Sequence, residues 1–140
     1  MCKINDEISC TIKNQDYTYK IVDYHRNGLP PPSKWIVIPK DELNCFINSI
    51  NNDWIINDRA WGIILNENKC KVIGLNEKSE EVKIATFKTH KNSNFWHGYP
   101  YNIAKLQDRP HTNVLINWRD NGFIKKTEMS RISRGIKCNL

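Results

Sequence analysis

Apolar and polar residues alternate near the start of the chain. Within residues 8–12 every second residue is apolar, and the same alternation returns within residues 17–21. The residues between these runs include the polar triplet 14–16. Because successive side chains of a strand point to opposite faces of a sheet, the pattern predicts a β-hairpin.

A different spacing follows Pro39, a residue that fits the first turn of a helix. Five apolar residues recur at i, i+3, i+4, i+7 and i+11: Leu43, Phe46, Ile47, Ile50 and Trp54. This spacing predicts a helix over about residues 40–51 with one apolar stripe toward the core. Cys45 lies off the stripe, so we expect its side chain to point away from the core.

Short β-rich runs surround this helix in the sequence. Residues 35–38 form one candidate strand before it. Three further runs, 60–65, 70–75 and 82–89, are separated by short polar turns, which is typical of an antiparallel meander.

The last part of the chain changes to helical signals. Thr112 and Gly122 suit the beginning and end of one helix, and Thr127 and Gly135 those of a second helix. Together the elements predict an α+β fold. It has a mainly antiparallel sheet of about five or six strands, one packed helix (about 40–51) and a C-terminal helical pair.

Composition divides the chain into two parts. A length of 140 residues fits a single domain, with an N-terminal sheet-forming part, 1–90, and a basic aromatic loop plus helical pair, 91–140. Residues 1–84 carry 11 Lys and Arg against 12 Asp and Glu, whereas residues 85–140 carry 10 against 3. The excess positive charge therefore lies in the last part, which favours a polyanionic partner, although a solvated basic face would give the same composition.

Several sequence features that would indicate a compartment or a cofactor are missing from the chain. The start of the chain has no apolar leader segment and no run is long enough to span a bilayer, so we expect a cytoplasmic protein without membrane contact. Five widely spaced cysteines without a CxxC pair fit reduced thiols. No local pair of metal ligands and no glycine-rich phosphate loop is present, so neither a metal nor a small-molecule cofactor is expected.

Aromatic residues concentrate in the segment 95–101, which we predict to be a loop. Aromatic faces beside lysines are the combination that holds unstacked bases, and a basic arc on the last helix suits phosphate contact. The candidate binding residues are Trp96, Tyr99, Tyr101, Lys88, Lys91, Lys126, Arg131, Arg134 and Lys137. The first hypothesis is a non-enzymatic nucleic-acid-binding module, with RNA or single-stranded nucleic acid favoured over duplex DNA. Core packing of Trp96 is the plainer alternative.

Histidines in the same region suggest a second hypothesis. RNA cleavage without a metal requires a general base, a general acid and a cation for the phosphate. His97 and His111 are candidates for the acid–base pair, and Arg109, Lys88 or Lys91 for the cation, as in a small RNase of toxin type.

A third hypothesis uses the aromatics to bind a protein. Trp, Tyr and Arg dominate protein-binding hot spots, so the chain is also compatible with an inhibitor, immunity or anti-defence factor that binds a protein partner, an acidic one given its basic charge. No particular residue distinguishes this hypothesis from the first.

Overall fold

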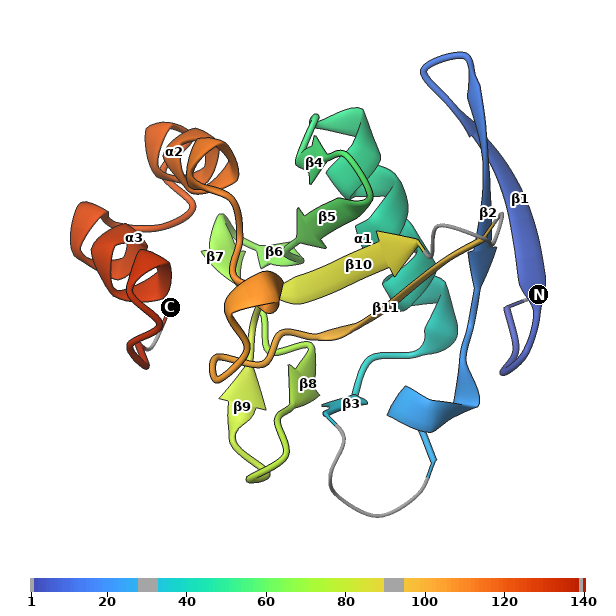
Figure 1. Ribbon diagram of the computed structural model, residues 1–140, viewed down its shortest axis with the longest axis horizontal. Coiled ribbons are helices and arrows are strands. Elements are labelled where there is room, and N and C mark those ends of the chain that lie inside the picture. The colour runs from blue at the N-terminus through green and yellow to red at the C-terminus, as the bar shows by residue number, and fades with distance from the viewer. Residues whose placement is uncertain (1, 28–32, 90–94, 139) are drawn as a thin grey trace.

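The structure, a computed structural model, describes residues 2–27, 33–89, 95–138 and 140. One helix packs on a mixed sheet, and two C-terminal helices lie together at the end of the sheet opposite the N-terminal hairpin (Figure 1). The predicted α+β fold is therefore confirmed.

Within the described residues the main sheet has six strands. In spatial order they are β1 (Glu7–Ile12), β2 (Gln15–Lys20), β11 (Phe95–Pro100), β10 (Ala85–Thr89), β5 (Arg59–Gly62) and β4 (Ile55–Ile56). Neighbouring strands are antiparallel except for β11 and β2, which run parallel. The predicted hairpin is confirmed as β1 and β2, and among the described strands it joins the rest of the sheet through that parallel pair.

Two smaller sheets complete the strands. One contains β3 (Lys34–Trp35), β8 (Gly74–Leu75) and β9 (Glu81–Val82), and the other contains β6 (Leu65–Asn66) and β7 (Lys69–Cys70). The predicted antiparallel pairing of consecutive runs is confirmed at both turns, as β6 with β7 and β8 with β9. The three runs do not form one meander sheet, however, because β5 and β10 of the first and last runs pair directly in the main sheet, while β8 also pairs with β3.

The helices match the predicted positions closely. They are α1 (Pro39–Asn51), α2 (Thr112–Asp120) and α3 (Lys126–Ser133), with the short 3-10 helices η1 (Asp23–His25) and η2 (Leu106–Asp108). Asn121 caps α2 and Gly122 follows it with a positive φ of 77°, a conformation that glycine adopts without strain.

Two apolar cores hold these elements together. In the first, Phe46 of α1 packs against Tyr19, Phe87 and Trp96, with ring centroids 4.8, 5.4 and 5.6 Å away. In the second, Trp54 meets Trp118 of α2 edge to face at 5.6 Å. The first core joins α1 to the sheet, and the second joins the other end of the sheet to α2 and α3.

The aromatic segment is a strand, so its prediction as a loop is wrong. Trp96 and Gly98 of β11 face the core that contains Phe87, while His97 and Tyr99 face the other side. Because both faces of this strand are at least half covered, aromatics occur on both, and the alternation that identifies a strand is hidden.

Candidate functional site

Basic side chains form a row across the outer face of the sheet, which is the face opposite α1. Lys88 of β10 is in register with Arg59 of β5 on one side and with His97 of β11 on the other. Directly opposed residues of antiparallel strands share a face. The parallel register of β11 with β2 places Lys20 beside His97, one step beyond the pair Trp96 and Tyr19. We call Lys20, His97, Lys88 and Arg59 the basic row.

Neighbouring groups position the cations of this row. The Lys20 ammonium lies 5.4 Å from the centroid of the Phe95 ring, and the Lys88 ammonium lies 5.4 Å from that of Tyr99. Both distances fit cation–π contacts. Arg59 donates a hydrogen bond to the backbone carbonyl of Gln107 at 3.0 Å. Each of these three cations is therefore held at the sheet surface.

The adjacent part of the outer face is covered by the segment around η2. Trp61 and Thr86 donate hydrogen bonds from their side chains to the backbone carbonyl of Asp108, at 3.0 and 3.1 Å. The Tyr99 hydroxyl donates to the Asp108 carboxylate at 2.7 Å. These bonds hold the segment over the side chains of Trp61, Thr86 and Tyr99. The basic row lies beside this covered area.

Two carboxylates border the row: Glu7 of β1 lies directly opposite Lys20, and at the other end Asp108 pairs with Arg59 and has oxygens that already have donors. Only 1% of Asp108 is exposed, and its carboxylate also accepts from the Asn102 backbone N–H at 3.3 Å and pairs with Arg59 at 3.5 Å. Neither Lys20 nor Lys88 forms an ion pair with a carboxylate in the described part of the chain. With three cations against the carboxylates of Glu7 and Asp108, the row keeps a net excess of one positive charge.

Burial, and to a lesser extent neighbouring cations, lowers the pKa values of two nearby groups. Burial lowers the pKa of the Lys88 ammonium, and the charges of Arg59 and Lys105 lower it further. The His25 ring is stacked on Tyr99 with centroids 4.7 Å apart, and burial lowers the pKa of its imidazole, as do Lys88 and Lys105. Such a region stabilises a bound anion, because an anion offsets the mutual repulsion of the cations.

The structure brings some predicted site residues together and separates others. His97 and Lys88 are neighbours in the basic row, whereas His111 is exposed and caps α2, its Nδ1 accepting from the Asn113 backbone N–H at 3.1 Å. The Arg109 guanidinium packs against Gly135 beyond α3. No hydrogen bond or ring contact among the described residues joins the His97 and His111 imidazoles. Lys91 lies outside the described residues.

Burial contradicts one part of the binding prediction. Trp96, Tyr99 and Tyr101 are only 8%, 6% and 8% exposed, so their faces are not available for stacking with bases. The physical reason is that all three belong to the packing around β11, where Trp96 contacts Phe46 and Tyr99 is covered by His25. Phe95 is half-buried and lies beside Lys20 of the basic row.

The other predicted cations lie on α3 and just after it, away from the basic row. Lys126, Arg131, Arg134 and Lys137 are all exposed, as the helical wheel predicts. Lys137 pairs with Glu80, and Arg134 donates to the Ser130 carbonyl at 3.3 Å. This surface is a second basic patch, formed by one helix and its tail, with the Arg109 guanidinium beside it at Gly135.

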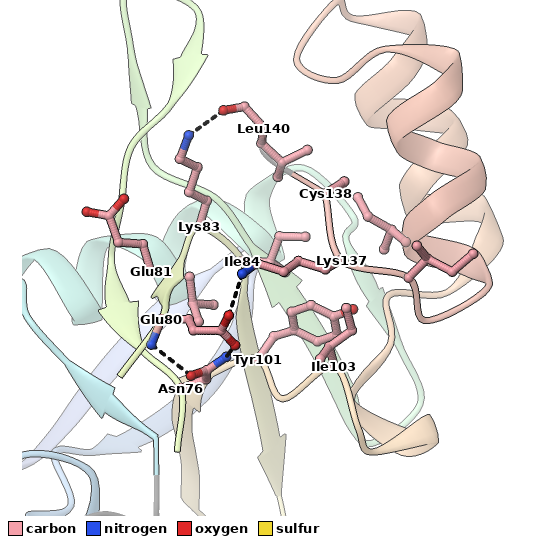
Figure 2. Close-up of a pocket in the computed structure, with 13 residues that line it drawn as sticks. Asn76, Glu80, Glu81, Lys83, Ile84, Tyr101, Ile103, Lys137, Cys138 and Leu140 are labelled. Carbon is pink, nitrogen blue, oxygen red and sulfur yellow. Dashed lines mark hydrogen bonds and ion pairs between the residues drawn. The ribbon is translucent and has the colours of Figure 1, made fainter. Parts of the chain in front are cut away.

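A cavity of about 330 Å³ lies between β9 and the residues that follow α3 (Figure 2). Its walls include Ile84, Ile103 and the ring of Tyr101, and Lys137 and Lys83 close it by bonding to Glu80 and to the Leu140 carbonyl. Burial raises the pKa of Tyr101 to about 12. Two carboxylates, Glu80 and Glu81, and two ammonium groups, Lys83 and Lys137, line the cavity, so it lacks the net positive charge of the basic row.

The described residues contain neither a cluster of metal ligands nor a helix that could span a membrane. No group of three His, Cys, Asp or Glu side chains there is arranged to hold a metal ion. None of the helices in that part of the chain has the length and apolar character needed to cross a bilayer. Comparisons with known proteins also gave no relative: no protein family, curated protein or solved structure matches the chain.

Sequence reasoning missed Lys20, Arg59, Lys105 and His25 as members of this region. Lys20 and Arg59 come from separate strands that are far from Lys88 in the sequence, and only the strand order places them in one row. Alternation within β2 indicates the face of Lys20, because Tyr19 beside it is fully buried. The sequence gives no comparable signal to show which strand lies next to β2.

Proposed function

We propose that the protein binds single-stranded nucleic acid, RNA above all, through the basic row on the outer face of its sheet. The observation that carries this proposal is the alignment of Lys20, His97, Lys88 and Arg59 on four adjacent strands beside a buried, already engaged carboxylate. Three strand spacings of about 4.8 Å make the row about 14 Å long, enough to contact more than one phosphate.

A single strand fits this surface better than a duplex. Sheet faces hold extended strands whose bases stack on exposed aromatic rings. Phe95 lies beside Lys20 and is half-buried, so it offers a ring edge or face next to a phosphate-binding cation. Duplex recognition by α3 is the competing arrangement, and its cations lie on a different surface.

The test measures the affinity of a fluorescent single-stranded RNA of mixed sequence at several salt concentrations. We expect Lys20→Gln combined with Lys88→Gln to weaken binding about tenfold at low salt. Each lost phosphate contact should also reduce the slope of log affinity against log salt by about 0.7, so the double variant should lose about 1.4.

Two further double variants locate the surface. Lys69→Gln with Lys71→Gln removes the same charge from exposed positions on and beside β7, and it should bind almost as the wild type does. Arg131→Gln with Arg134→Gln removes two positive charges from α3. The proposal is contradicted if the α3 variant loses more affinity than the Lys20 and Lys88 variant, or if polyglutamate competes as well as RNA. The latter result would indicate an acidic protein partner.

A further inference from the structure

The basic row contains one imidazole, that of His97, and it stands between two ammonium groups. His97 lies beside Lys20 on one side and opposite Lys88 on the other. Its ring is half-buried on the outer face. An imidazole is the side chain best suited to accept a proton at pH 7, so a phosphate held by the flanking cations would lie within reach of a base.

We propose that the basic row cleaves the RNA that it binds, with His97 as general base and Lys88 as general acid. The inference rests on the proposed RNA binding and assigns chemistry to the same surface. It replaces the predicted pair of His97 and His111, because His111 is engaged at the start of α2.

The reaction is an intramolecular transesterification. His97 takes the proton of a ribose 2′-hydroxyl, and the 2′-oxygen forms a bond to the adjacent phosphorus. The bond from phosphorus to the 5′-oxygen breaks, and the leaving oxygen takes a proton from the Lys88 ammonium. The products are a 2′,3′-cyclic phosphate and a 5′-hydroxyl, and the two side chains regain their starting states by exchanging protons with water.

The surroundings suit the two roles. Burial and the charge of Arg59 lower the pKa of Lys88, which makes its ammonium a stronger acid than a solvated lysine. Arg59 is held toward the row by its contacts with Gln107 and Asp108, so its guanidinium can stabilise the charge that develops on the phosphoryl oxygens.

The experiment incubates the whole protein with a long unstructured RNA in which every dinucleotide step occurs, and analyses the ends of the products. The wild type should yield cyclic-phosphate ends, while the DNA of the same sequence stays intact because it lacks the attacking hydroxyl. His97→Gln should reduce the cleavage rate by at least 100-fold. Its loss of RNA affinity should be far smaller than its loss of cleavage rate, and it should retain the wild-type unfolding midpoint. Lys88→Gln should lower the cleavage rate by more than its loss of affinity explains.

The outcomes separate this inference from the binding proposal. RNA that is bound but not cleaved by the wild type would overturn the catalytic inference and leave the binding proposal standing. Absence of binding would overturn both. Cleavage that survives in His97→Gln, or that is lost equally in His111→Asn, would overturn the assignment of the roles. Lys69→Gln with Lys71→Gln controls for charge, and equal loss of cleavage there would also count against the basic row.

Discussion

Tyr99 and Tyr101 are two residues apart, but their hydroxyl groups have different surroundings. The Tyr99 hydroxyl donates to the buried Asp108 carboxylate at 2.7 Å, whereas the buried Tyr101 hydroxyl has no hydrogen-bond partner in the described part of the chain. A buried donor that lacks a partner loses its hydration without compensation. The two residues therefore allow the same change, removal of one oxygen, to be compared in opposite contexts.

We expect Tyr99→Phe to lower the free energy of unfolding by about 1–3 kcal/mol, because it leaves the Asp108 carboxylate short of a donor. Tyr101→Phe should leave the stability unchanged or raise it by up to about 1 kcal/mol. Urea unfolding of both variants measures the difference. A larger loss in Tyr101→Phe than in Tyr99→Phe would contradict the hydrogen-bond assignment.

Among the elements, β11 is the one on which both the core and the basic row depend. It lies between β10 and β2, and its inner face is so closely packed that Gly98 has no room for a side chain. A Cβ at that position would lie 2.2 Å from Cδ1 of Phe87 and 3.0 Å from the Tyr19 hydroxyl. The glycine is required by close approach here, since its φ is not positive.

We expect Gly98→Ala to destabilise the protein by about 3 kcal/mol or more, because the Phe87 ring cannot move out of a full core without opening a void. Gly122→Ala is the matched control. A Cβ there meets nothing within 4 Å, and only the positive φ of 77° is unfavourable, at about 1 kcal/mol. Thermal or urea unfolding should rank the two variants in that order, and equal losses would argue against the close packing of β11.

Local patterns predicted the elements whose partners are near in sequence. The hairpin of β1 and β2 and the helix α1 follow from spacing alone, because each is specified by residues within about one element length. The same reasoning from spacing was wrong for Cys45. Its side chain was expected to point away from the core, yet only 1% of the residue is exposed. It is buried because Gly62 opposite it lacks a side chain, and a Cβ there would lie 2.7 Å from the Cys45 sulfur.

The candidate site could not be predicted in the same way, because its members meet only through the sheet order. The charge division of the sequence assigned the basic character to residues 85–140. In the fold, Lys20 and Arg59 of the nearly neutral part join Lys88 and His97 through β2 and β5. Parallel pairing of β2 with β11 has no signature in a single sequence, since no turn connects the two strands.

At the scale of the whole molecule, one buried carboxylate joins α1 to β2 and to the residue that follows η1. Glu42 of α1 accepts from the Tyr19 hydroxyl at 2.5 Å and from Arg26 at 2.7 Å, and Arg26 also donates to the Val37 carbonyl. Burial nevertheless raises the pKa of Glu42 to about 7, above its ordinary 4.5, because desolvation outweighs the attraction of Arg26.

This raised pKa predicts how the stability of the whole protein changes with pH. Between about pH 4.5 and 7 the folded protein holds a proton on Glu42 that the unfolded chain has released, so the contribution of Glu42 to stability falls as pH rises through this window. We expect the loss to be on the order of 1 kcal/mol per pH unit and to be absent in Glu42→Gln. Urea unfolding at pH 5, 6, 7 and 8 measures it, and Asp53→Asn controls for removal of a carboxylate at the surface. If the wild type instead gains stability relative to Glu42→Gln with rising pH, Arg26 holds the carboxylate ionised and the predicted direction is wrong.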